Sequence, residues 1–560
     1  MTKGESVVHI VTMEAENYRT FRHVRMVFHS QLNYLVGSHR IGKSNFLDLL
    51  HTLHTGTRFA ETDFFDTEAP LRIRITLQLK TRHILLADGY PLNDDDGFLH
   101  LEVTQRVSDE TFTVVNMETG QPVNRISLHR LRYVAHMPSR LGRWGIAPDR
   151  KARFKAAIEG YFEERGQAAI ELLGEVAQRT GVRAEEVAQA TAQVDDWLTY
   201  LHTGVPDERA AAQTFRMLLA AVFQLVSELT ELKDSDGKFW ENNLLIDSRN
   251  RRYLPLVISI DEPEIHLHPF LQRALLHFYR DIVANQSRLV KDLLSYFLGV
   301  DGLEGQLFVV THSTDCLIDD YHHIVRLYRD GKGRVLAACG AEFSFAPDVE
   351  KHLVMHFPEV KEALYARSVL IVEGETEYGA FFEFGKTLGV HFDYVGISLI
   401  NARGESSIAR IAELFSRFGL GTVKLYDSDV REQIGDMPDT FFTEGPCFEL
   451  DVVRHLLANR GLKQLRSVVR LIGGSDGQVR REMATKAARK WKPDGKRYFG
   501  AKKLKNISGR DTDGLQFYYF AWFYSNKGVI VGRALGKTLT AEMIPRSFRQ
   551  AIERAAELAR

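Results

Sequence analysis

QLNYLVGSHRIGKS, residues 31–44, is the stretch that decides the fold of the first half of the chain. It begins as an apolar, strand-like run and continues as a complete G-x-x-x-x-G-K-S loop, after which leucines recur at helical spacing. In such a loop Gly37 and Gly42 let the backbone wrap so that its N–H groups face phosphates. Lys43 would reach the β- and γ-phosphates, and Ser44 would ligate Mg²⁺. The stretch therefore predicts a site for ATP with Mg²⁺ between a strand and a helix.

Two later strand-like runs fit the same site. LVISIDE, residues 256–262, ends in two acids, of which Asp261 would hold Mg²⁺ and Glu262 would polarise the attacking water. VVTHS, residues 309–313, ends in His312, which could contact the γ-phosphate. Alone, His312 fits a satisfied strand-end histidine equally well. Beside the other two motifs, we expect it in the nucleotide site.

A second set of motifs, much further along the chain, is acidic. SVLIVEGETE, residues 368–377, predicts a buried strand that ends in Glu373, with Glu377 in the first turn of the next helix. Asp427 and Asp429 are two residues apart after another strand, so they point to the same side. Carboxylates gathered at strand ends repel one another unless a cation is present, and oxygen ligands suit Mg²⁺, Mn²⁺ or Ca²⁺. The pattern predicts a metal site for phosphodiester cleavage; the alternative is a set of solvated acidic loops.

The length and the order of the predicted elements indicate more than one domain. The chain has 560 residues, too many for one core, and its pattern changes near residue 345. Before that point strand-like segments surround a helical stretch over 148–232, and after it a β-α-β-α-β order predicts a parallel sheet with covering helices. We expect one domain over 1–345, with 148–232 as a helical insertion, and a second over 346–560.

The composition bears on nucleic-acid binding, the cell compartment and membrane association. A net charge of −1 gives no global basic field, but residues 480–505 are locally basic and contain Trp491, Tyr498 and Phe499. Such a run could follow a phosphate backbone and stack on bases, or it could be an exposed helix with a loop. The three cysteines form no CxxC pair, the N-terminus has no apolar signal region, and no apolar run reaches membrane-spanning length. We expect a cytoplasmic protein with no membrane association.

A resemblance supports the nucleotide site. DEPEIHLHP, residues 261–269, resembles the DEPE-x-HLHP segment of the ABC-type ATPases related to SMC and RecF proteins. The resemblance implies that two ATPase heads dimerise around ATP and that a signature loop from the partner completes each site. No LSGGQ-like segment precedes the predicted helix at 213–229; residues 203–208 occupy the expected place, and residues 235–238 are a weaker candidate. We therefore expect ATP to regulate activity more than to power it.

A second resemblance covers the acidic motifs. EALYARSVLIVEGETE, residues 362–377, and NARG, residues 401–404, resemble the Toprim domain of the OLD (overcoming lysogenization defect) nucleases. The resemblance implies a Toprim domain from about residue 366 to residue 560, with catalysis and metal binding by the acidic residues Glu373, Glu377, Asp427 and Asp429.

The same resemblance implies two further site residues. OLD nucleases carry an additional acidic residue after the aspartate pair, for which Glu449 is the first choice; Asp451 is equally near, and the next candidates are Asp511 and Asp513. They also use a C-terminal lysine near the scissile phosphate. Lys537 fits that position best, and Lys527 is second.

Together these observations predict an α/β protein: an ABC/SMC-type P-loop ATPase head with a helical insertion, followed by a C-terminal Toprim domain. The resemblance to OLD proteins, which include the Gabija type used against phage, implies an ATP-binding, metal-dependent DNA endonuclease. It also implies a homodimer or higher oligomer, associated through the helical insertion, with a co-encoded helicase or other defence protein as a partner. The alternatives are an SMC/RecF-like DNA-binding ATPase, or a sensor module that recruits a separate effector. A primase would not need such a head, and a topoisomerase would need a tyrosine-bearing cleavage domain for which there is no room.

Overall fold

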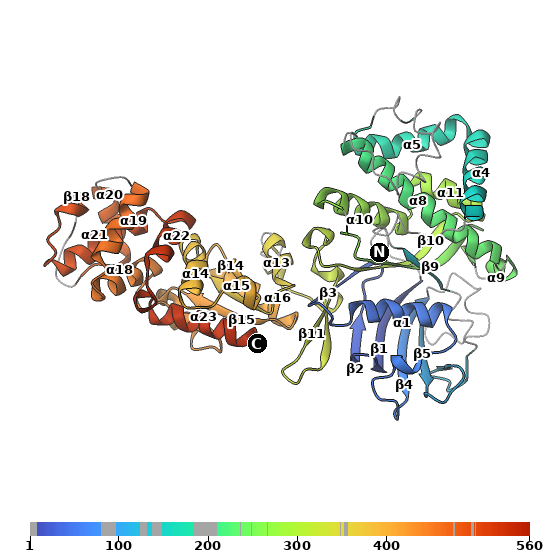
Figure 1. Ribbon diagram of the computed structural model, residues 1–560, viewed down its shortest axis with the longest axis horizontal. Helices are drawn as coiled ribbons and strands as arrows, with labels where there is room; N and C mark the ends of the chain where they lie inside the picture. The colour runs from blue at the N-terminus through green and yellow to red at the C-terminus, as the bar shows by residue number, and fades with distance from the viewer. Residues whose placement is uncertain are drawn as a thin grey trace. The chain divides into compact units, whose positions relative to one another are not determined.

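The structure is a computed structural model that describes residues 8–79, 97–123, 131–136, 148–182, 187, 210–235, 237–242, 244–247, 249–265, 267–347, 349–351, 357–473, 477–493, 498 and 500–560. The chain divides into two compact units, Met1–Phe343 and Ser344–Arg560 (Figure 1). Each unit has its own sheet and its own core, so each is described by itself. Among the described residues, no helix is both long and apolar enough to cross a bilayer.

The first unit contains two sheets. The antiparallel sheet has the order β2 (Phe21–Val27), β1 (Val8–Tyr18), β4 (Leu71–Leu79), β5 (Phe98–Gln105), β6 (Thr113–Asn116). The other sheet has the order β12 (Val335–Cys339), β11 (Ile324–Arg329), β3 (Leu32–Gly37), β10 (Gly302–Val310), β9 (Arg252–Asp261), β7 (Arg132–His136), with β8 (Leu245–Ile246) also on β9. Strands β11, β3, β10, β9 and β7 run parallel to one another. Four of these five strands are buried over most of their length, which accounts for their apolar sequences.

The helix α1 (Lys43–Thr55) packs into the core that the two sheets share. Its Phe46 ring lies 5.4 Å from the rings of Phe28 and Phe308, measured between centroids. The buried Gln306 side chain joins the sheets as well, because its amide accepts a hydrogen bond from the Ile10 N–H and donates one to the Ile10 carbonyl. Strand β10 of the mainly parallel sheet is thus joined to strand β1 of the antiparallel sheet within one core.

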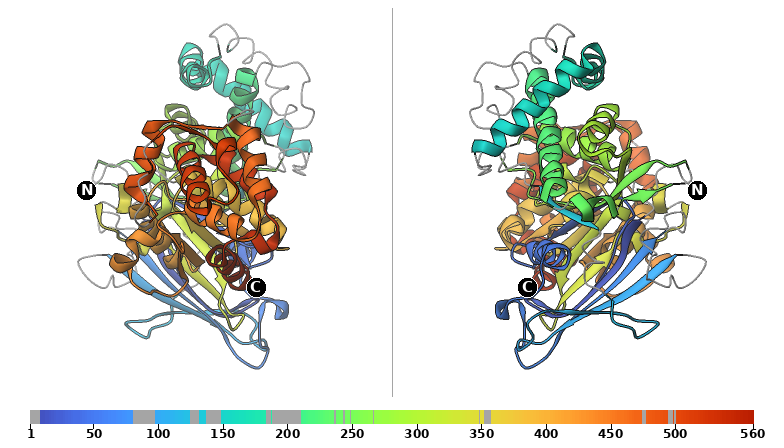
Figure 2. Two further views of the ribbon diagram at one scale, coloured as in Figure 1. Left: turned by 90° about the vertical axis from the view of Figure 1, so that its left-hand side faces the viewer. Right: turned by 90° about the vertical axis from the view of Figure 1, so that its right-hand side faces the viewer.

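The remaining helices of the first unit gather on the other side of the mainly parallel sheet (Figure 2). They are α4 (Pro148–Arg165), α5 (Gln167–Thr180), α8 (Ala210–Ser235), α9 (Gly237–Asn242), α10 (Pro269–Val283) and α11 (Arg288–Leu298). Helix α8 packs on α5, α10 and α11. Within residues 148–232 the structure describes the helices α4, α5 and α8, and the helical insertion over this range stays a prediction. The favoured position of the signature loop, 203–208, lies outside the described residues.

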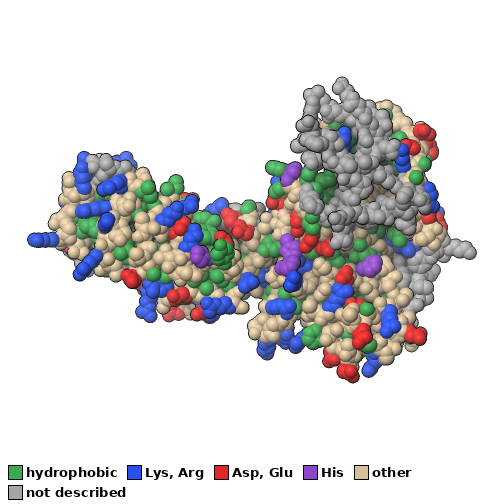
Figure 3. All heavy atoms as spheres, viewed as in Figure 1, with side chains coloured by type: hydrophobic (Ala, Val, Ile, Leu, Met, Phe, Trp, Pro, Cys, Tyr) green, Lys and Arg blue, Asp and Glu red, His purple; other side chains and the backbone are tan. Residues whose placement is uncertain are grey.

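The second unit is built on a parallel sheet with the order β14 (Ile397–Asn401), β13 (Ser368–Val372), β15 (Gly421–Tyr426), β16 (Thr440–Phe442). Its covering helices include α14 (Glu375–Thr387), α16 (Glu405–Arg417), α22 (Val529–Thr538) and α23 (Arg546–Leu558). A helical part adds α18 (Phe448–Ala458), α19 (Leu462–Gly473), α20 (Arg481–Lys490), α21 (Thr512–Ser525) and the short strands β17 (Gln478–Val479) and β18 (Lys502–Lys503). Lys and Arg side chains gather over the end where α19, α20 and β18 lie (Figure 3).

Candidate functional site

The phosphate loop joins β3 to α1, and two close contacts shape it. A Cβ at Gly37 would lie 2.3 Å from the carbonyl oxygen of Leu327, and one at Gly42 would lie 2.7 Å from Thr20 Oγ1. Both glycines also have positive φ, 139° and 116°, a region that residues with a Cβ rarely adopt. The loop follows this path only with glycine at both positions.

Lys43 begins α1 and turns back into the loop. Its ammonium donates hydrogen bonds to the carbonyl oxygens of Gly37 and Ser38, both at 3.0 Å. The side chain is buried, and burial lowers the pKa of Lys43 to about 8. Ser44 follows in the exposed first turn of the helix. A buried ammonium at the N-terminus of a helix, within a glycine loop, is an arrangement that binds phosphate groups.

The other predicted nucleotide residues lie along the same edge of the sheet. Strand β10 lies between β3 and β9, with Val310 in register with Asp261 at the end of β9. His312 Nε2 is 3.6 Å from Glu262 Oε1. Burial, followed by the positive charge of Lys43, lowers the pKa of His312. The structure thus brings the loop, the two acids and the histidine together, as three separate sequence motifs predicted.

Glu264 is a residue of this site to which the sequence reasoning gave no role. Its carboxylate accepts hydrogen bonds from Thr311 Oγ1 at 2.8 Å and from the His312 N–H at 2.6 Å. It therefore fixes the turn that carries His312. The Glu262 N–H donates to the Val310 carbonyl at 2.8 Å, which holds Glu262 at a positive φ of 49°. Glu264 could have been found from the sequence, because it is the second glutamate of the DEPE segment that resembles the ABC-type ATPases.

The acidic site lies at the carboxyl ends of two adjacent strands of the second unit. Glu373 follows β13 and Asp427 follows β15, and the Asp427 N–H is 3.3 Å from Glu373 Oε2. Glu377 is in the first turn of α14, and Glu449 is the second residue of α18. Glu377 and Asp427 are each 7% exposed and Glu449 is 1% exposed. Four carboxylates therefore meet in a place that is largely shielded from water.

The charges of this cluster show that it suits a cation. Burial raises the pKa of Glu373, and burial with the neighbouring charge of Glu449 raises that of Glu377. Burial, then the charges of Glu377 and Glu373, raise the pKa of Asp427 to about 9. Both carboxylate oxygens of Glu449 are buried without a hydrogen bond, and Oε2 has an ion-pair contact with a lysine ammonium. Buried carboxyl oxygens that lack hydrogen-bond donors fit the ligand set of a hard divalent ion.

Of the two lysines predicted from the C-terminal part of the sequence, Lys527, the second choice, is the one that lies at this site. Its Nζ is 3.2 Å from Glu449 Oε2. Burial alone would lower the pKa of Lys527, but the charges of Glu449 and Glu377 outweigh burial and raise it. The residue is held because the Gly528 N–H donates to Thr376 Oγ1 at 3.1 Å, in the first turn of α14.

Lys537, the first choice from the sequence for the lysine near the scissile phosphate, does not lie at the acidic cluster. Helix α22 packs along α14 through glycines, and a Cβ at Gly532 would lie 1.9 Å from the Thr376 carbonyl oxygen. One turn later Gly536 meets Glu383, which is about 9 Å further along α14 than Glu377 at 1.5 Å per residue. Lys537 is exposed, and among the described contacts none joins it to the acidic cluster. The expectation failed because sequence spacing does not show which end of α22 faces the site.

Asp429 and the remaining acidic candidates have other partners. Asp429 is 44% exposed and forms an ion pair with Lys490, whose Nζ is also 3.9 Å from Asp427 Oδ2. Asp451 accepts hydrogen bonds from the N–H groups of residues 444 and 445, at 2.5 and 2.6 Å, so it closes a turn. Asp511 caps α21 by accepting from the Gly514 N–H. Of the two nearest acidic candidates, Glu449 is therefore the one in the cluster.

The aromatic residues of the basic run face inward. The Trp491 ring is 5.9 Å from that of Phe520, and the Tyr498 ring is 4.9 Å from that of Phe517, on the buried helix α21. Phe499 lies outside the described residues. Trp491 and Tyr498 are thus partly buried against the core, and base stacking by these aromatics stays a prediction. The basic side chains remain at the surface (Figure 3).

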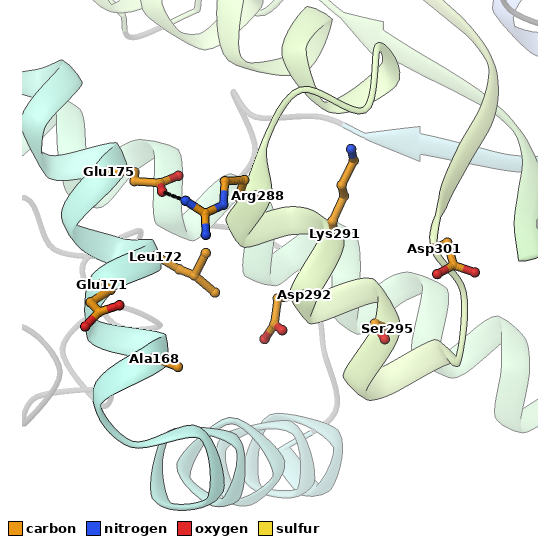
Figure 4. A pocket seen from close by; sticks show the side chains of 9 residues that line it. All are labelled: Ala168, Glu171, Leu172, Glu175, Arg288, Lys291, Asp292, Ser295 and Asp301. Carbon is orange, nitrogen blue, oxygen red and sulfur yellow. Dashed lines mark hydrogen bonds and ion pairs between the residues drawn. The ribbon is translucent and has the colours of Figure 1, made fainter. Parts of the chain in front are cut away.

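Two other charged sites already contain ion pairs. Among the described residues, Glu14, Glu16 and His23 form a trio with ligand atoms within 4.8 Å of one another, but Arg72 and Arg74 pair with the same carboxylates. A cavity of about 540 Å³ lies between α5 and α11, lined by acidic and basic side chains (Figure 4). There Arg288 pairs with Glu175, and Asp292 accepts a hydrogen bond from the Tyr161 hydroxyl at 2.8 Å. In both places, part of the charge is thus already paired within the described residues.

Comparison with known proteins identifies part of the second unit. Residues 364–429 match the family model described as "Overcoming lysogenization defect protein-like, TOPRIM domain". The chain thus carries an OLD-like Toprim domain, as its sequence predicted. The match covers the ends of both strands that bear Glu373 and Asp427, and it ends at Asp429. The predicted α/β fold class with a C-terminal Toprim domain is confirmed, and the phosphate loop after β3 and the acids at the end of β9 have the arrangement predicted for a P-loop head.

Proteins that match longer parts of the chain are more distant relatives. "Uncharacterized protein YbjD" of Escherichia coli (strain K12) is 23% identical over 366 residues, which are 62% of this chain and 57% of YbjD. The chain thus spans little more than half the length of that relative. The SMC head domain from Thermotoga maritima is 11% identical and covers 59% of this chain and 98% of that one, with a TM-score of 0.29. The C-terminal region of the Burkholderia pseudomallei OLD protein is 17% identical and covers 35% of this chain and 100% of that one, with a TM-score of 0.24.

Proposed function

We propose that this chain is a divalent-metal-dependent DNA endonuclease whose activity is regulated by ATP at its head. One observation carries the proposal: four carboxylates, from two strand ends and two helix starts, meet beside the OLD-like Toprim motif, three of them buried, with Lys527 as a cation at one side. A cluster of this kind is stable with all carboxylates ionised only if a cation joins it. The nearby Lys527 supplies a positive charge for a phosphate.

The roles of the residues follow from their positions. Glu373, Glu377, Asp427 and Glu449 would hold Mg²⁺ or Mn²⁺, which when bound would polarise the phosphate and lower the pKa of the attacking water. Asp429, which is exposed, would join the site from its rim. The ammonium of Lys527 would offset the charge that develops on the phosphate and the leaving oxygen.

The head would bind ATP with Mg²⁺ as a regulatory ligand. Lys43 would exchange its two carbonyl partners for the β- and γ-phosphates, since phosphate oxygens are stronger acceptors for an ammonium. Ser44 and Asp261 would hold the Mg²⁺ of the nucleotide. Glu262 and His312 lie where the γ-phosphate would be expected, so slow hydrolysis could reset the regulation.

The biological part of the proposal is an anti-phage effector of the OLD class. We propose that the chain works as a homodimer or higher oligomer that associates through the helical insertion. A co-encoded helicase or another defence protein would be its partner. This part rests on the sequence resemblance, and phage plating on cells that carry the wild type or Glu373→Ala would test it.

The experiment that tests the activity is cleavage of supercoiled plasmid with Mg²⁺ or Mn²⁺, with and without ATP. We expect nicked or linear product from the wild type and at least a hundredfold less from Glu373→Ala. Glu375→Ala is the matched control, because Glu375 is an exposed acid on the same turn. Lys43→Ala shows whether ATP activates or represses cleavage. If the wild type cleaves plasmid with neither metal, the endonuclease hypothesis is replaced by one of the two alternatives, an SMC/RecF-like DNA-binding ATPase or a sensor module.

A further inference from the structure

Lys490 is a basic residue of the acidic site with no role in the proposed reaction. It is the last residue of α20, and its side chain is 23% exposed. Its Nζ forms an ion pair with Asp429 and is 3.9 Å from Asp427 Oδ2. One ammonium thus contacts both members of the Asp427-Ser428-Asp429 motif, which the sequence assigned to a metal.

Lys490 is also one of three lysines around the same edge. Lys486, one helical turn earlier on the same face of α20, has its Nζ 5.3 Å from the centroid of the Tyr524 ring. Lys527 Nζ is 4.5 Å from the centroid of that ring and 3.2 Å from Glu449. The Tyr524 ring thus has two ammonium groups near it. Lys490 and Lys527 contact the carboxylates, and Lys486 adds a third positive charge close to them.

An ammonium and a divalent ion compete for the same carboxylate lone pairs, so binding of one weakens the binding of the other. Mg²⁺ and Mn²⁺ carry twice the charge of an ammonium and accept carboxylate oxygens at short distances. Lys490 is at the end of its helix, and its four-carbon side chain can turn to another acceptor. An oxygen of a nucleic-acid phosphate is the acceptor that a group of lysines favours.

We propose that Lys490 is a positioning residue that exchanges partners: it holds Asp429 and Asp427 until a divalent metal binds, and then contacts a phosphate of the DNA strand. This inference rests on the proposed metal-dependent nuclease. The exchange makes the binding of metal and of DNA cooperative. Metal binding frees Lys490 to contact a phosphate, and the phosphate contact leaves Asp427 and Asp429 free for the metal. Lys490 thereby couples the two ligands without itself taking part in bond cleavage.

Metal binding without DNA is the first test. Mn²⁺ affinity, measured by electron paramagnetic resonance, should tighten about fivefold in Lys490→Gln, because the competing cation is gone. Lys486→Gln removes the same charge one turn away and should change the affinity by less than about twofold. Affinity that is unchanged or weaker in Lys490→Gln overturns the exchange. No Mn²⁺ binding by the wild type would overturn the proposed metal site as well, so the two failures are distinguishable.

DNA binding is the second test, measured by fluorescence anisotropy over a series of salt concentrations. With Ca²⁺ present, the wild type should show a salt dependence steeper by about one phosphate contact than with chelator. In Lys490→Gln that difference between Ca²⁺ and chelator should disappear, and in Lys486→Gln it should persist. A difference that persists in Lys490→Gln would show that another residue makes the new contact, and would overturn the proposal.

Discussion

The two candidate sites are built on the same plan, but the buried groups at their centres carry opposite charges. In each unit the functional groups follow the carboxyl ends of adjacent parallel strands, and one strand leads directly into a helix. At the head, the site is a backbone loop around the buried ammonium of Lys43. In the Toprim domain it is a group of buried carboxylates with lysines at its rim.

This difference shows what each ligand demands of a protein. A phosphate chain needs fixed N–H donors, so the path of the backbone decides the head site, and glycine is required where no Cβ fits. A divalent cation needs negative charge, so the side chains decide the Toprim site, at the cost of repulsion between them. Substitutions should therefore damage folding at the first site and alter charge at the second.

The largest effect on stability should come from Gly37→Ala. The new Cβ would lie 2.3 Å from the Leu327 carbonyl oxygen, a backbone atom that cannot move aside, and φ is +139°. Strain and overpacking together should lower the free energy of unfolding of the head by roughly 3 kcal/mol. Urea unfolding followed by hydrogen exchange of α1 and β3 measures this loss.

Gly120→Ala is the matched control for Gly37→Ala. Gly120 also has a positive φ, +66°, but a Cβ there would meet nothing within 4 Å. Its substitution should cost only about 1 kcal/mol, the strain of the backbone conformation alone. Equal losses for the two variants would mean that the close contact with β11 does not shape the phosphate loop.

Next in size is the effect of Lys527→Ala on plasmid cleavage. Its ammonium is 3.2 Å from Glu449, and its removal should slow cleavage about a hundredfold. Because Lys527 is the ion-pair partner of the buried Glu449, the folding of the variant is checked by circular dichroism in the presence of Mg²⁺. Lys537→Ala, which removes an exposed lysine from α22, should change the rate by less than about twofold. A larger loss of cleavage rate in Lys537→Ala than in Lys527→Ala would restore Lys537 as the lysine near the scissile phosphate.

The residues found by sequence and those missed differ in one physical respect. Gly37, Lys43, Asp261 and Glu373 lie in motifs or directly after buried strands, and parallel strand ends meet at one edge whatever the rest of the fold does. The choice between Lys527 and Lys537 depended instead on how α22 packs on α14. Packing of that kind follows from contacts between distant segments, which spacing along a single sequence does not contain. The inward packing of the aromatics in the basic run was missed for the same reason.

The opposite charges of the buried groups at the two sites should also give opposite responses to pH. The pKa of Lys43 is lowered to about 8 by burial, so between pH 8 and the unfolded value of 10.5 the folded head binds fewer protons than the unfolded chain. Stability of the head should therefore rise with pH over that range.

For the Toprim domain the sign is reversed. Burial, then Glu377 and Glu373, raise the pKa of Asp427 to about 9, above its unfolded value of 3.8, so the folded domain binds more protons. Its stability in chelator should fall as pH rises toward 9, by a few degrees in melting temperature, and Mg²⁺ should reverse the fall. Hydrogen exchange of β3 and β13 separates the two units. Lys43→Met should remove the slope of the head only, and Asp427→Asn should reduce the slope of the Toprim domain only, because Glu373 and Glu377 keep raised pKa values. Slopes of the same sign that survive both substitutions would mean that these two groups do not control the pH dependence.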